Sequence, residues 1–318
     1  MATVTAGVDL GGTKIQSVVV TGGRVVGQAR HPTPRTTAED VMAEIVTCVR
    51  EALGASGSQP SDLQGVGIGT PGSVDGATGH VSKSSNVPGF LADVALGPTV
   101  GAALGGIPVT VDNDVRAAVM GEYHRGAGRP YQNLLGVFVG TGVGGGLVLQ
   151  GALRRGRGSA GEIGHTVVKR GGRRCSCGRR GCLEAYAGRL SIEQAARRSQ
   201  AKGHHTSLFE IMEDKGRDRV SSAVIASALE KGDRVVVDLV DQAVRALGVA
   251  LANAQNLLDL EAIIVGGGLG DRLGAPFVDR VREAMIKHLR LPDQPPVVVG
   301  TELGDLSGAV GATVVAGG

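Results

Sequence analysis

The sequence contains no tryptophan, and its few aromatic residues make up only 2% of the 318 positions. A protein that binds single-stranded nucleic acid by stacking the bases needs exposed aromatic rings. The formal net charge is only +3, whereas a dedicated nucleic-acid-binding domain is strongly basic. We therefore expect no nucleic-acid partner.

Long hydrophobic runs are also missing. No stretch approaches the roughly 20 apolar residues that a membrane span requires, and the first residues show no basic region followed by an apolar one. Apolar residues nevertheless make up 42% of the chain, which suffices for a packed core and, at this length, suggests two domains. We expect a cytoplasmic protein with no membrane partner.

Cysteine is scarce, and three of the four cysteines lie within eight positions: Cys175, Cys177 and Cys182. This spacing is unlike a disulfide framework. Three thiolates need a fourth ligand to complete a tetrahedral zinc site, and His165 is the nearest histidine upstream. Cys48 lies in a helical pattern and is more simply a small core residue. We predict a structural zinc site, with redox-active or inert thiols as the alternative.

Glycine, in contrast, is abundant, with 53 residues and no regular period, which excludes a collagen-like chain. Many glycines follow predicted strands. Each half of the sequence opens with a strand, a glycine turn and a second strand: Val4–Leu10 with Ile15–Val20, and Leu134–Val139 with Leu147–Leu149. We interpret this as weak internal duplication, because the turns differ in length, and place a domain boundary near Val115.

Two of these turns are candidate phosphate-binding loops, because glycine exposes backbone N–H groups and lets a phosphate approach closely. The predicted nucleotide-binding residues of the first loop are Asp9, Gly11, Gly12, Thr13 and Lys14, and those of the second are Gly140, Thr141, Gly142 and Gly144. Asp9 could hold Mg²⁺ through water. A third cluster, Gly266, Gly267 and Gly268, suits the close approach of an adenosine. An ordinary hairpin turn is the simpler interpretation of either loop alone.

Two other nucleotide-binding motifs are excluded. The P-loop pattern does not occur in the sequence. The segment from Gly142 to Gly144 resembles part of a dinucleotide fingerprint, but a predicted strand follows it where that fingerprint requires a helix.

An acidic segment, Asp112-Asn113-Asp114, lies where a short apolar strand meets a predicted helix. Phosphoryl transfer to an alcohol needs positioning, charge neutralisation and an acceptor for the hydroxyl proton, and a carboxylate can be that acceptor. Asn and Asp are also frequent N-cap residues. The segment therefore predicts a general base, a helix cap, or both roles divided between neighbouring residues.

Together these features resemble the ROK family of sugar kinases and repressors, and within it the bacterial glucokinases. The resemblance covers essentially the whole chain. Its most specific element is Glu162-Ile163-Gly164-His165 followed by Cys175-x-Cys177-Gly178-x-x-Gly181-Cys182-x-Glu184. The two glycine loops match the two phosphate loops of the family.

The resemblance implies an α/β, actin-like (ribonuclease H-like) two-domain ATPase fold with the active site in an interdomain cleft. Residues 1–115, joined by the C-terminal segment 303–318, would form the small domain. Residues 116–302 would form the large domain, which carries the zinc-binding loop. The implied cofactors are ATP, Mg²⁺ and a structural Zn²⁺, and the implied assembly is a homodimer or homotetramer.

The resemblance also implies roles for individual residues. Asp114 would be the general base, and the sugar contacts would be Gly72, Asn86, Asn113, Asp114, Glu162, His165 and Glu184. His165 would bind zinc through one ring nitrogen and the sugar through the other. The chain departs from the family pattern at Asn86–Phe90 and at Val115-Arg116, both near the sugar end, which leaves the choice of sugar open.

The leading hypothesis is ATP-dependent phosphorylation of glucose at O6. The same reaction on an amino sugar, N-acetylmannosamine or N-acetylglucosamine, is the nearest alternative, and two groups of arginines leave a polyphosphate donor open. A sugar-responsive repressor is an alternative of another class. Such repressors carry an added helix-turn-helix segment, which we do not expect because the first predicted strand starts by about Thr3. A non-catalytic sugar sensor is disfavoured by Asp114 and the two loops.

Overall fold

The computed structural model describes residues 3–317, which divide into two compact units. The first unit comprises residues 3–129 and 305–317, and the second comprises residues 130–304. The predicted boundary near Val115 falls at the start of helix α3 (Asp114–Arg125), which packs against α10 (Ser307–Val315) inside the first unit. Within residues 3–317, none of the helices combines the length and apolar character needed to cross a bilayer.

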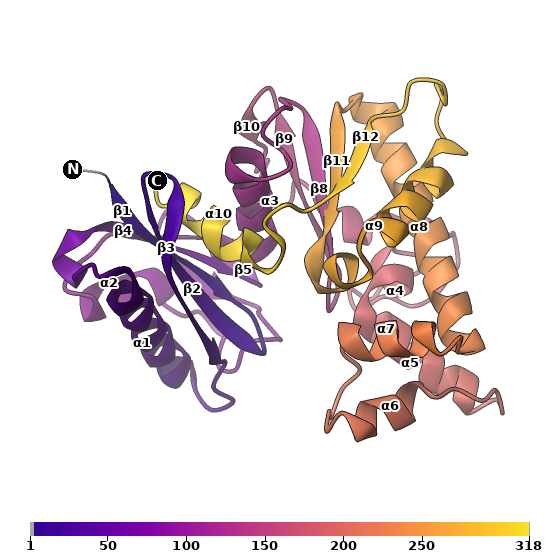
Figure 1. The fold of residues 1–318 in the computed structure, drawn as a ribbon, viewed down its shortest axis with the longest axis horizontal. Coiled ribbons are helices and arrows are strands. Elements are labelled where there is room, and N and C mark those ends of the chain that lie inside the picture. Colours follow the sequence, from indigo (N-terminus) through magenta and orange to yellow (C-terminus); the bar gives the residue numbers. More distant parts are fainter. Residues whose placement is uncertain (1–2, 318) are drawn as a thin grey trace. The chain divides into compact units, whose positions relative to one another are not determined.

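The first unit is built on a mixed five-stranded sheet of order β3-β2-β1-β4-β7 (Figure 1). β1, β2 and β3 are antiparallel neighbours, whereas β1, β4 and β7 run parallel. A two-stranded hairpin, β5–β6, follows β4. The strands are β1 (Val4–Leu10), β2 (Lys14–Thr21), β3 (Arg24–Pro32), β4 (Leu63–Thr70), β5 (Ser73–Asp75), β6 (His80–Ser82) and β7 (Val109–Asn113).

Helices cover the two faces of this sheet, and β1 shows why. Its side chains alternate, so that Val8 joins the aliphatic core beneath α1 (Ala38–Ser56), whereas Gly7 faces α10. α1 begins at the N-cap Thr37, which accepts a hydrogen bond from Asp40 N. The remaining helices of this unit are η1 (Pro60–Asp62), α2 (Leu96–Ala103), α3 and, in the returning segment, η3 (Gly304–Leu306) and α10.

The second unit repeats the architecture with the order β10-β9-β8-β11-β12. β8, β9 and β10 are antiparallel neighbours, and β8, β11 and β12 run parallel. The strands are β8 (Leu134–Val139), β9 (Val143–Leu149), β10 (Ala152–Leu153), β11 (Ala262–Gly266) and β12 (Val297–Gly300). β9 begins at Val143, so the prediction of a strand that starts only at Leu147 was wrong. Glycines 144–146 are strand residues, and the turn itself is short.

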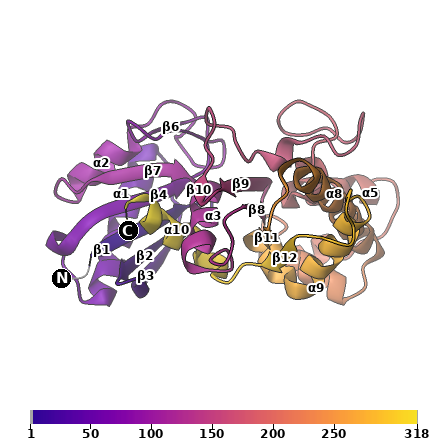
Figure 2. The same ribbon diagram turned by 90° about the horizontal axis from the view of Figure 1, so that it is seen from above.

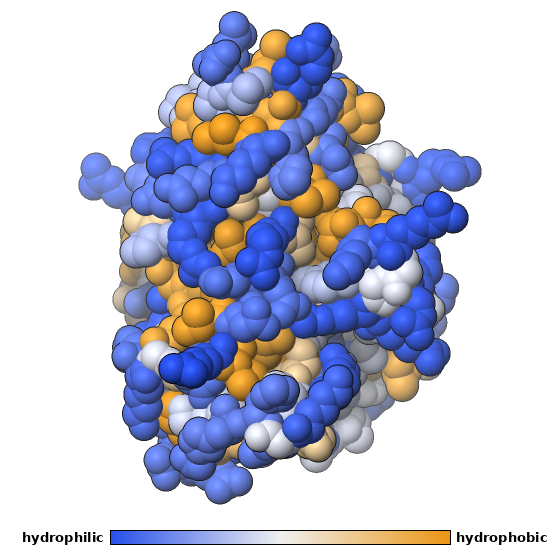
Figure 3. All heavy atoms as spheres, turned by 90° about the vertical axis from the view of Figure 1, so that its right-hand side faces the viewer, coloured by the Kyte–Doolittle hydropathy of each residue, from blue (hydrophilic) through white to orange (hydrophobic). Residues whose placement is uncertain are grey.

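The core of the second unit is formed by aliphatic side chains from the sheet and from its helices. In Figure 2, α8 and α9 lie beside one another within this unit. Figure 3 shows one face of the molecule, on which hydrophilic side chains surround smaller hydrophobic areas. The helices are η2 (Ile163–His165), α4 (Glu184–Ala187), α5 (Arg189–Gln200), α6 (Leu208–Asp214), α7 (Ser222–Glu230), α8 (Arg234–Leu258) and α9 (Gly267–Ile286).

Candidate active site

Three residues predicted to bind the sugar, Gly72, Asn113 and Asp114, lie where the parallel strands β4 and β7 of the first sheet end. In the strand register Asp9 of β1 lies beside Gly69 of β4, and Gly69 lies beside Asp112 of β7. A Cβ added to Gly69 would lie 3.3 Å from Cα of Asp114, so that Asp114 packs directly over this edge. Gly72 follows β4 with φ +112°, a backbone conformation that favours glycine. The carboxyl ends of strands in α/β sheets are where ligands bind.

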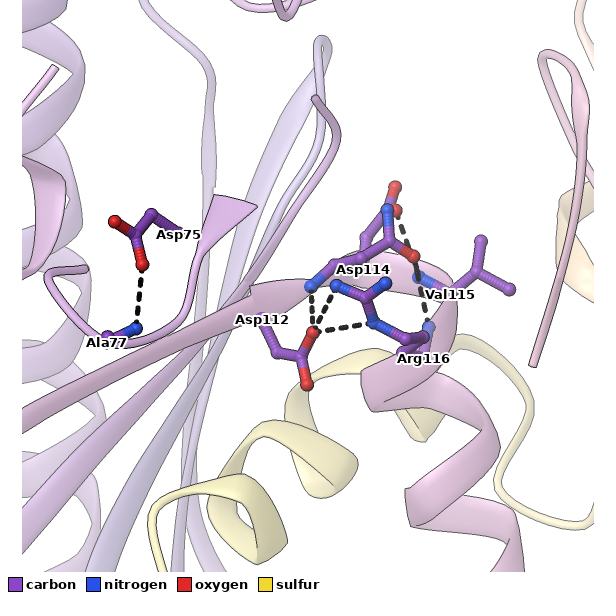
Figure 4. A network of polar contacts seen from close by, with 7 residues as sticks. Asp75, Ala77, Asp112, Asp114, Val115 and Arg116 are labelled. Carbon is purple, nitrogen blue, oxygen red and sulfur yellow. Dashed lines mark hydrogen bonds and ion pairs between the residues drawn. The ribbon is translucent and has the colours of Figure 1, made fainter. Parts of the chain in front are cut away.

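The acidic segment at the start of α3 divides its tasks among three residues (Figure 4). Asn113 is the N-cap, because its Oδ1 accepts hydrogen bonds from Val115 N at 3.1 Å and from Arg116 N at 3.2 Å. Asp112 is buried and forms an ion pair with the Arg116 guanidinium at 2.7 Å. Asp114 accepts a hydrogen bond from Val115 N at 2.9 Å and stays half-buried. Since Asn113 caps the helix, the Asp114 carboxylate is available for chemistry.

The Asp114 carboxyl group has an unusual affinity for protons. Burial, followed by the negative charge of Asp9, raises the pKa of Asp114 to about 6, against the opposing hydrogen bond from Val115. Burial also raises the pKa of Asp9, with the charge of Lys14 opposing and that of Asp305 adding to the shift. A general base works best when its pKa lies near the operating pH, and perturbed carboxyl groups cluster at functional sites. This pair therefore has the electrostatics of an acid–base site.

The first glycine loop joins β1 to β2 through residues 11–13. Gly11 N donates a hydrogen bond to Lys14 O at 2.9 Å across the loop. A Cβ at Gly12 would lie 2.3 Å from the carbonyl oxygen of Asn86, so the exposed Asn86 lies directly beside the loop. The structure thus brings Asn86 together with the first loop, as residues that share a ligand would require.

Lys14 points to a carboxylate. Its Nζ lies 2.8 Å from Asp305 Oδ1 and 3.2 Å from Gln16 Oε1, and Arg30 Nη1 lies 3.1 Å from the other Asp305 oxygen. Burial of Asp305 opposes its ionisation, but the hydrogen bond and charge of Lys14 prevail and lower the pKa of Asp305. Lys14, which was predicted to bind a phosphate, therefore already forms an ion pair with the Asp305 carboxylate.

The second glycine loop joins β8 to β9 through residues 140–142 and is as short as the first. Gly140 N donates to Gly142 O at 2.9 Å. The predicted difference in turn length was wrong, because three of the glycines counted as turn belong to β9.

The third glycine cluster, Gly266–Gly268, lies where β11 passes into α9. Gly267 has φ +82°, and a Cβ there would lie 2.7 Å from Val139 N. Since Val139 ends the strand that precedes the second loop, the two glycine clusters of the second unit are neighbours. They offer contiguous backbone to a flat or phosphorylated ligand.

The predicted metal ligands do lie together. The ligand atoms of His165, Cys175, Cys177 and Cys182 all lie within 4.8 Å of one another. Nδ1 of His165 lies 3.7 Å from Sγ of Cys175, and the Sγ atoms of Cys177 and Cys182 are 3.7 Å apart. A tetrahedral ion with metal–sulfur bonds of about 2.3 Å needs sulfur atoms about 3.8 Å apart. These residues fit a structural zinc ion, with the Nδ1 atom of His165 as the nitrogen ligand.

The metal cluster lies next to the second glycine loop. A Cβ at Gly164, in η2 between Glu162 and His165, would lie 1.9 Å from Val143 O, so η2 packs on the backbone of β9. Oε2 of Glu184 accepts a hydrogen bond from Val143 N at 3.1 Å. Glu184 therefore contacts the Val143 backbone directly, and η2, which follows Glu162 and ends at His165, packs on the same backbone.

Glu184 joins the metal-binding segment to this loop. Its Oε1 accepts a hydrogen bond from Ser176 Oγ at 2.8 Å, between two of the cysteine ligands. Its Oε2 contacts the loop so closely that a Cβ at Gly142 would lie 2.3 Å away. Glu184 was predicted as a sugar contact, and the structure gives it a further task, which is to hold the loop in place.

Two residues beside the loops were not predicted from sequence. Asp305 binds Lys14, and Arg189 donates from Nη2 to Thr141 Oγ1 at 2.8 Å. Their partners are far away in the sequence, 291 and 48 residues respectively. No short-range pattern marks such contacts, so only the fold could reveal them.

Comparison with known proteins identifies the family. The ROK family model matches residues 5–318. The chain belongs to the ROK family. Its sequence is 35% identical to a glucokinase of Streptomyces coelicolor, over 98% of this chain and 97% of that protein, and 31% identical to an N-acetylmannosamine kinase of Yersinia pseudotuberculosis, over 86% and 85%.

The fold comparison agrees. A ROK family glucokinase from Streptomyces griseus, solved in complex with glucose and AMPPNP, matches with a TM-score of 0.82 and 34% identity, over 98% of this chain and 99% of that one. The chain thus has the α/β two-domain, actin-like sugar kinase fold, and its family-level activity is that of a ROK sugar kinase.

Proposed function

We propose that this protein is an ATP-dependent glucokinase that phosphorylates glucose at O6, with Asp114 as the general base. The observation that carries the proposal is Asp114 itself, a half-buried carboxylate with a pKa of about 6 at the ligand-binding edge of the first sheet. The similarity to glucokinases over nearly the whole chain supports glucose as the substrate.

In the proposed reaction the O6 hydroxyl gives its proton to the Asp114 carboxylate as O6 bonds to the γ-phosphorus of ATP. The bond from that phosphorus to the β–γ bridging oxygen breaks, and ADP leaves. The residues proposed to contact sugar hydroxyls are Gly72, Asn86, Asn113, Glu162, His165 and Glu184. Asn113 uses its Oδ1 as a helix cap, so its amide NH₂ is the group left to donate to the sugar.

Backbone N–H groups of the two glycine loops are proposed to bind the phosphates, and Gly266–Gly268 to approach the adenosine. Mg²⁺ bound to the nucleotide would neutralise phosphate charge, with Asp9 as the residue that holds it through water. A zinc ion on the cysteine cluster would fix the tautomer of His165, because Nδ1 on the metal leaves Nε2–H to face the sugar. It would shape the sugar site and activate no nucleophile.

The experiment is the variant Asp114→Asn in a coupled ADP-release assay with glucose. We expect turnover to fall by about 10²–10⁴-fold, which is the usual contribution of a general base, with unchanged zinc content and thermal unfolding. Asp93→Asn, an exposed aspartate of the same unit, is the matched control and should retain full turnover. Near-normal turnover of Asp114→Asn would end the assignment.

A kinase for N-acetylmannosamine is the second candidate, because of the Yersinia relative. The segment 86–90 is anchored by the buried Val87 and Phe90, and a Cβ at Gly89 would lie 2.5 Å from Ala38 N. Such a segment cannot retreat cheaply to make room for an acetamide, which favours glucose. Comparing kcat/KM over a panel of hexoses and N-acetyl sugars decides between them. The predicted homodimer or homotetramer stays a prediction.

A further inference from the structure

The second glycine loop carries a guanidinium group for which the proposed reaction has so far no use. Arg189 is the first residue of α5, and its backbone N donates to Gly140 O at 3.0 Å. Its side chain donates from Nη2 to Thr141 Oγ1 at 2.8 Å and from Nη1 to the Val220 carbonyl oxygen. The side chain therefore lies along the tip of the loop.

This guanidinium has no carboxylate partner within ion-pair distance in residues 3–317. Glu193, whose negative charge acts on this guanidinium, is itself bound by Arg197 at 2.8 Å and by Val220 N at 3.2 Å. An arginine has five N–H donors, and the two acceptors of Arg189 are a neutral hydroxyl and a neutral carbonyl. Its full positive charge and several donors remain available, although it is half-buried.

The first loop contrasts with this. Its cation, Lys14, is neutralised by Asp305 at 2.8 Å, and a second cation, Arg30, binds the same carboxylate. A triphosphate chain that enters such loops needs positive charge from elsewhere. A guanidinium fork matches two phosphate oxygens in geometry as well as in charge.

We infer that Arg189 binds the phosphate chain of the nucleotide at the second loop and supplies the charge that Lys14 does not. This inference rests on the proposed function only in taking a nucleoside di- or triphosphate as the ligand. Thr141 then has two roles, since its hydroxyl fixes the guanidinium while its backbone belongs to the loop.

The test is calorimetric binding of ATP, ADP and adenosine to the intact chain and to Arg189→Gln, each with Mg²⁺ present. We expect ATP and ADP to bind about tenfold more weakly or worse, and adenosine, which has no phosphate, to bind as before. Arg197→Gln is the matched control, because Arg197 lies two turns along the same helix with Glu193 and the Phe209 ring as partners, and its affinities should stay unchanged. Lys14→Met should weaken ADP binding less than Arg189→Gln does.

ADP affinity within twofold of the wild type in Arg189→Gln would overturn the inference. An equal loss for adenosine would also overturn it, because the side chain would then only support the fold. If Arg189→Gln does not fold, Arg189→Met replaces it, since it keeps an aliphatic stem but loses the charge and the donors, and unchanged ADP affinity there is the contrary result. Binding is measured without turnover, so a wild type that binds ATP but phosphorylates no sugar would refute the proposed function and leave this inference standing.

Discussion

The two units of the chain share a plan but support their loops by different means. Each is a five-stranded mixed sheet in which a three-residue turn joins two antiparallel strands beside two parallel ones. In the first unit, tight backbone packing positions the loop, with an ion pair to close it. In the second, the side chains of Glu184 and Arg189 reach the loop from the segment that follows the metal ligands.

The backbone packing of the first unit depends on glycine. A Cβ at Gly67 of β4 would lie 1.8 Å from the Ala312 carbonyl oxygen, and one at Gly311 of α10 would lie 1.7 Å from the Ala117 carbonyl oxygen. These distances allow no side chain at all, so α10 is fixed against β4 and α3 by contact of main chains. The comparison teaches that main-chain packing supports the first unit, whereas polar side chains beside the predicted metal ligands support the loop of the second.

The largest expected effect comes from removing a predicted metal ligand. This change should disturb the structure of the second loop and leave the first loop as it is. Cys182→Ser should lose zinc and lower turnover by about 100-fold or more, because ligand and outer-shell partners hold Glu184 and His165 in place. Metal analysis and the ADP-release assay measure these two losses. Hydrogen exchange of the first unit is measured as well and should not change.

Cys48→Ala is the control for that variant. Cys48 is buried in α1 and lies outside the metal cluster, so zinc content should remain full despite some loss of stability. Full zinc occupancy and turnover in Cys182→Ser would contradict the role given to the cluster.

The next effect concerns the first unit alone. Gly67→Ala should reduce the free energy of unfolding by about 3 kcal/mol or more, because the added methyl group must displace main-chain atoms of α10. Gly54→Ala is the matched change. Gly54 lies in α1 with open space where its Cβ would be, and the substitution should stabilise by about 0.5–1 kcal/mol. Urea unfolding followed by circular dichroism measures both, and a Gly67→Ala protein as stable as the wild type would refute the packing argument.

A smaller effect is the pH dependence of turnover, which joins the first loop to Asp114. The base acts only when deprotonated, so kcat/KM should be flat above pH 7 and fall as the pH drops through about 6, approaching tenfold per pH unit. Because the charge of Asp9 helps to raise the pKa of Asp114, the residual activity of Asp9→Asn should fall off at a lower pH. An unmoved profile would mean that the two carboxylates do not interact.

Short-range patterns in the sequence predicted much of this site. The Cys-x-Cys spacing with His165 predicted a set of metal ligands, and these side chains do lie together. The strand–turn–strand repeats predicted the position of both loops. Two kinds of feature escaped. Three glycines read as turn form the start of β9, since pairing with β8 outweighs the low strand preference of glycine. The contacts of Arg189 and Asp305 depend on tertiary folding, so no local spacing could have indicated them.

The smallest effect belongs to a contact between β3 and α1 in the first unit. His31 on β3 is hydrogen-bonded through Nδ1 to Glu44 and through Nε2 to Glu51 at 2.8 Å, both on α1. The hydrogen bonds that His31 donates to Glu44 and then to Glu51 raise the pKa of His31. A raised folded-state pKa means that the stabilisation is fully present below the unfolded value, about 6.5, and is lost as the pH rises through the folded value.

His31→Gln should therefore cost more stability at pH 6 than at pH 9, by less than about 1 kcal/mol because Glu51 is well exposed. Urea unfolding at the two pH values measures the difference. A cost for His31→Gln that is equal at both pH values would mean that packing, and not charge, joins β3 to α1.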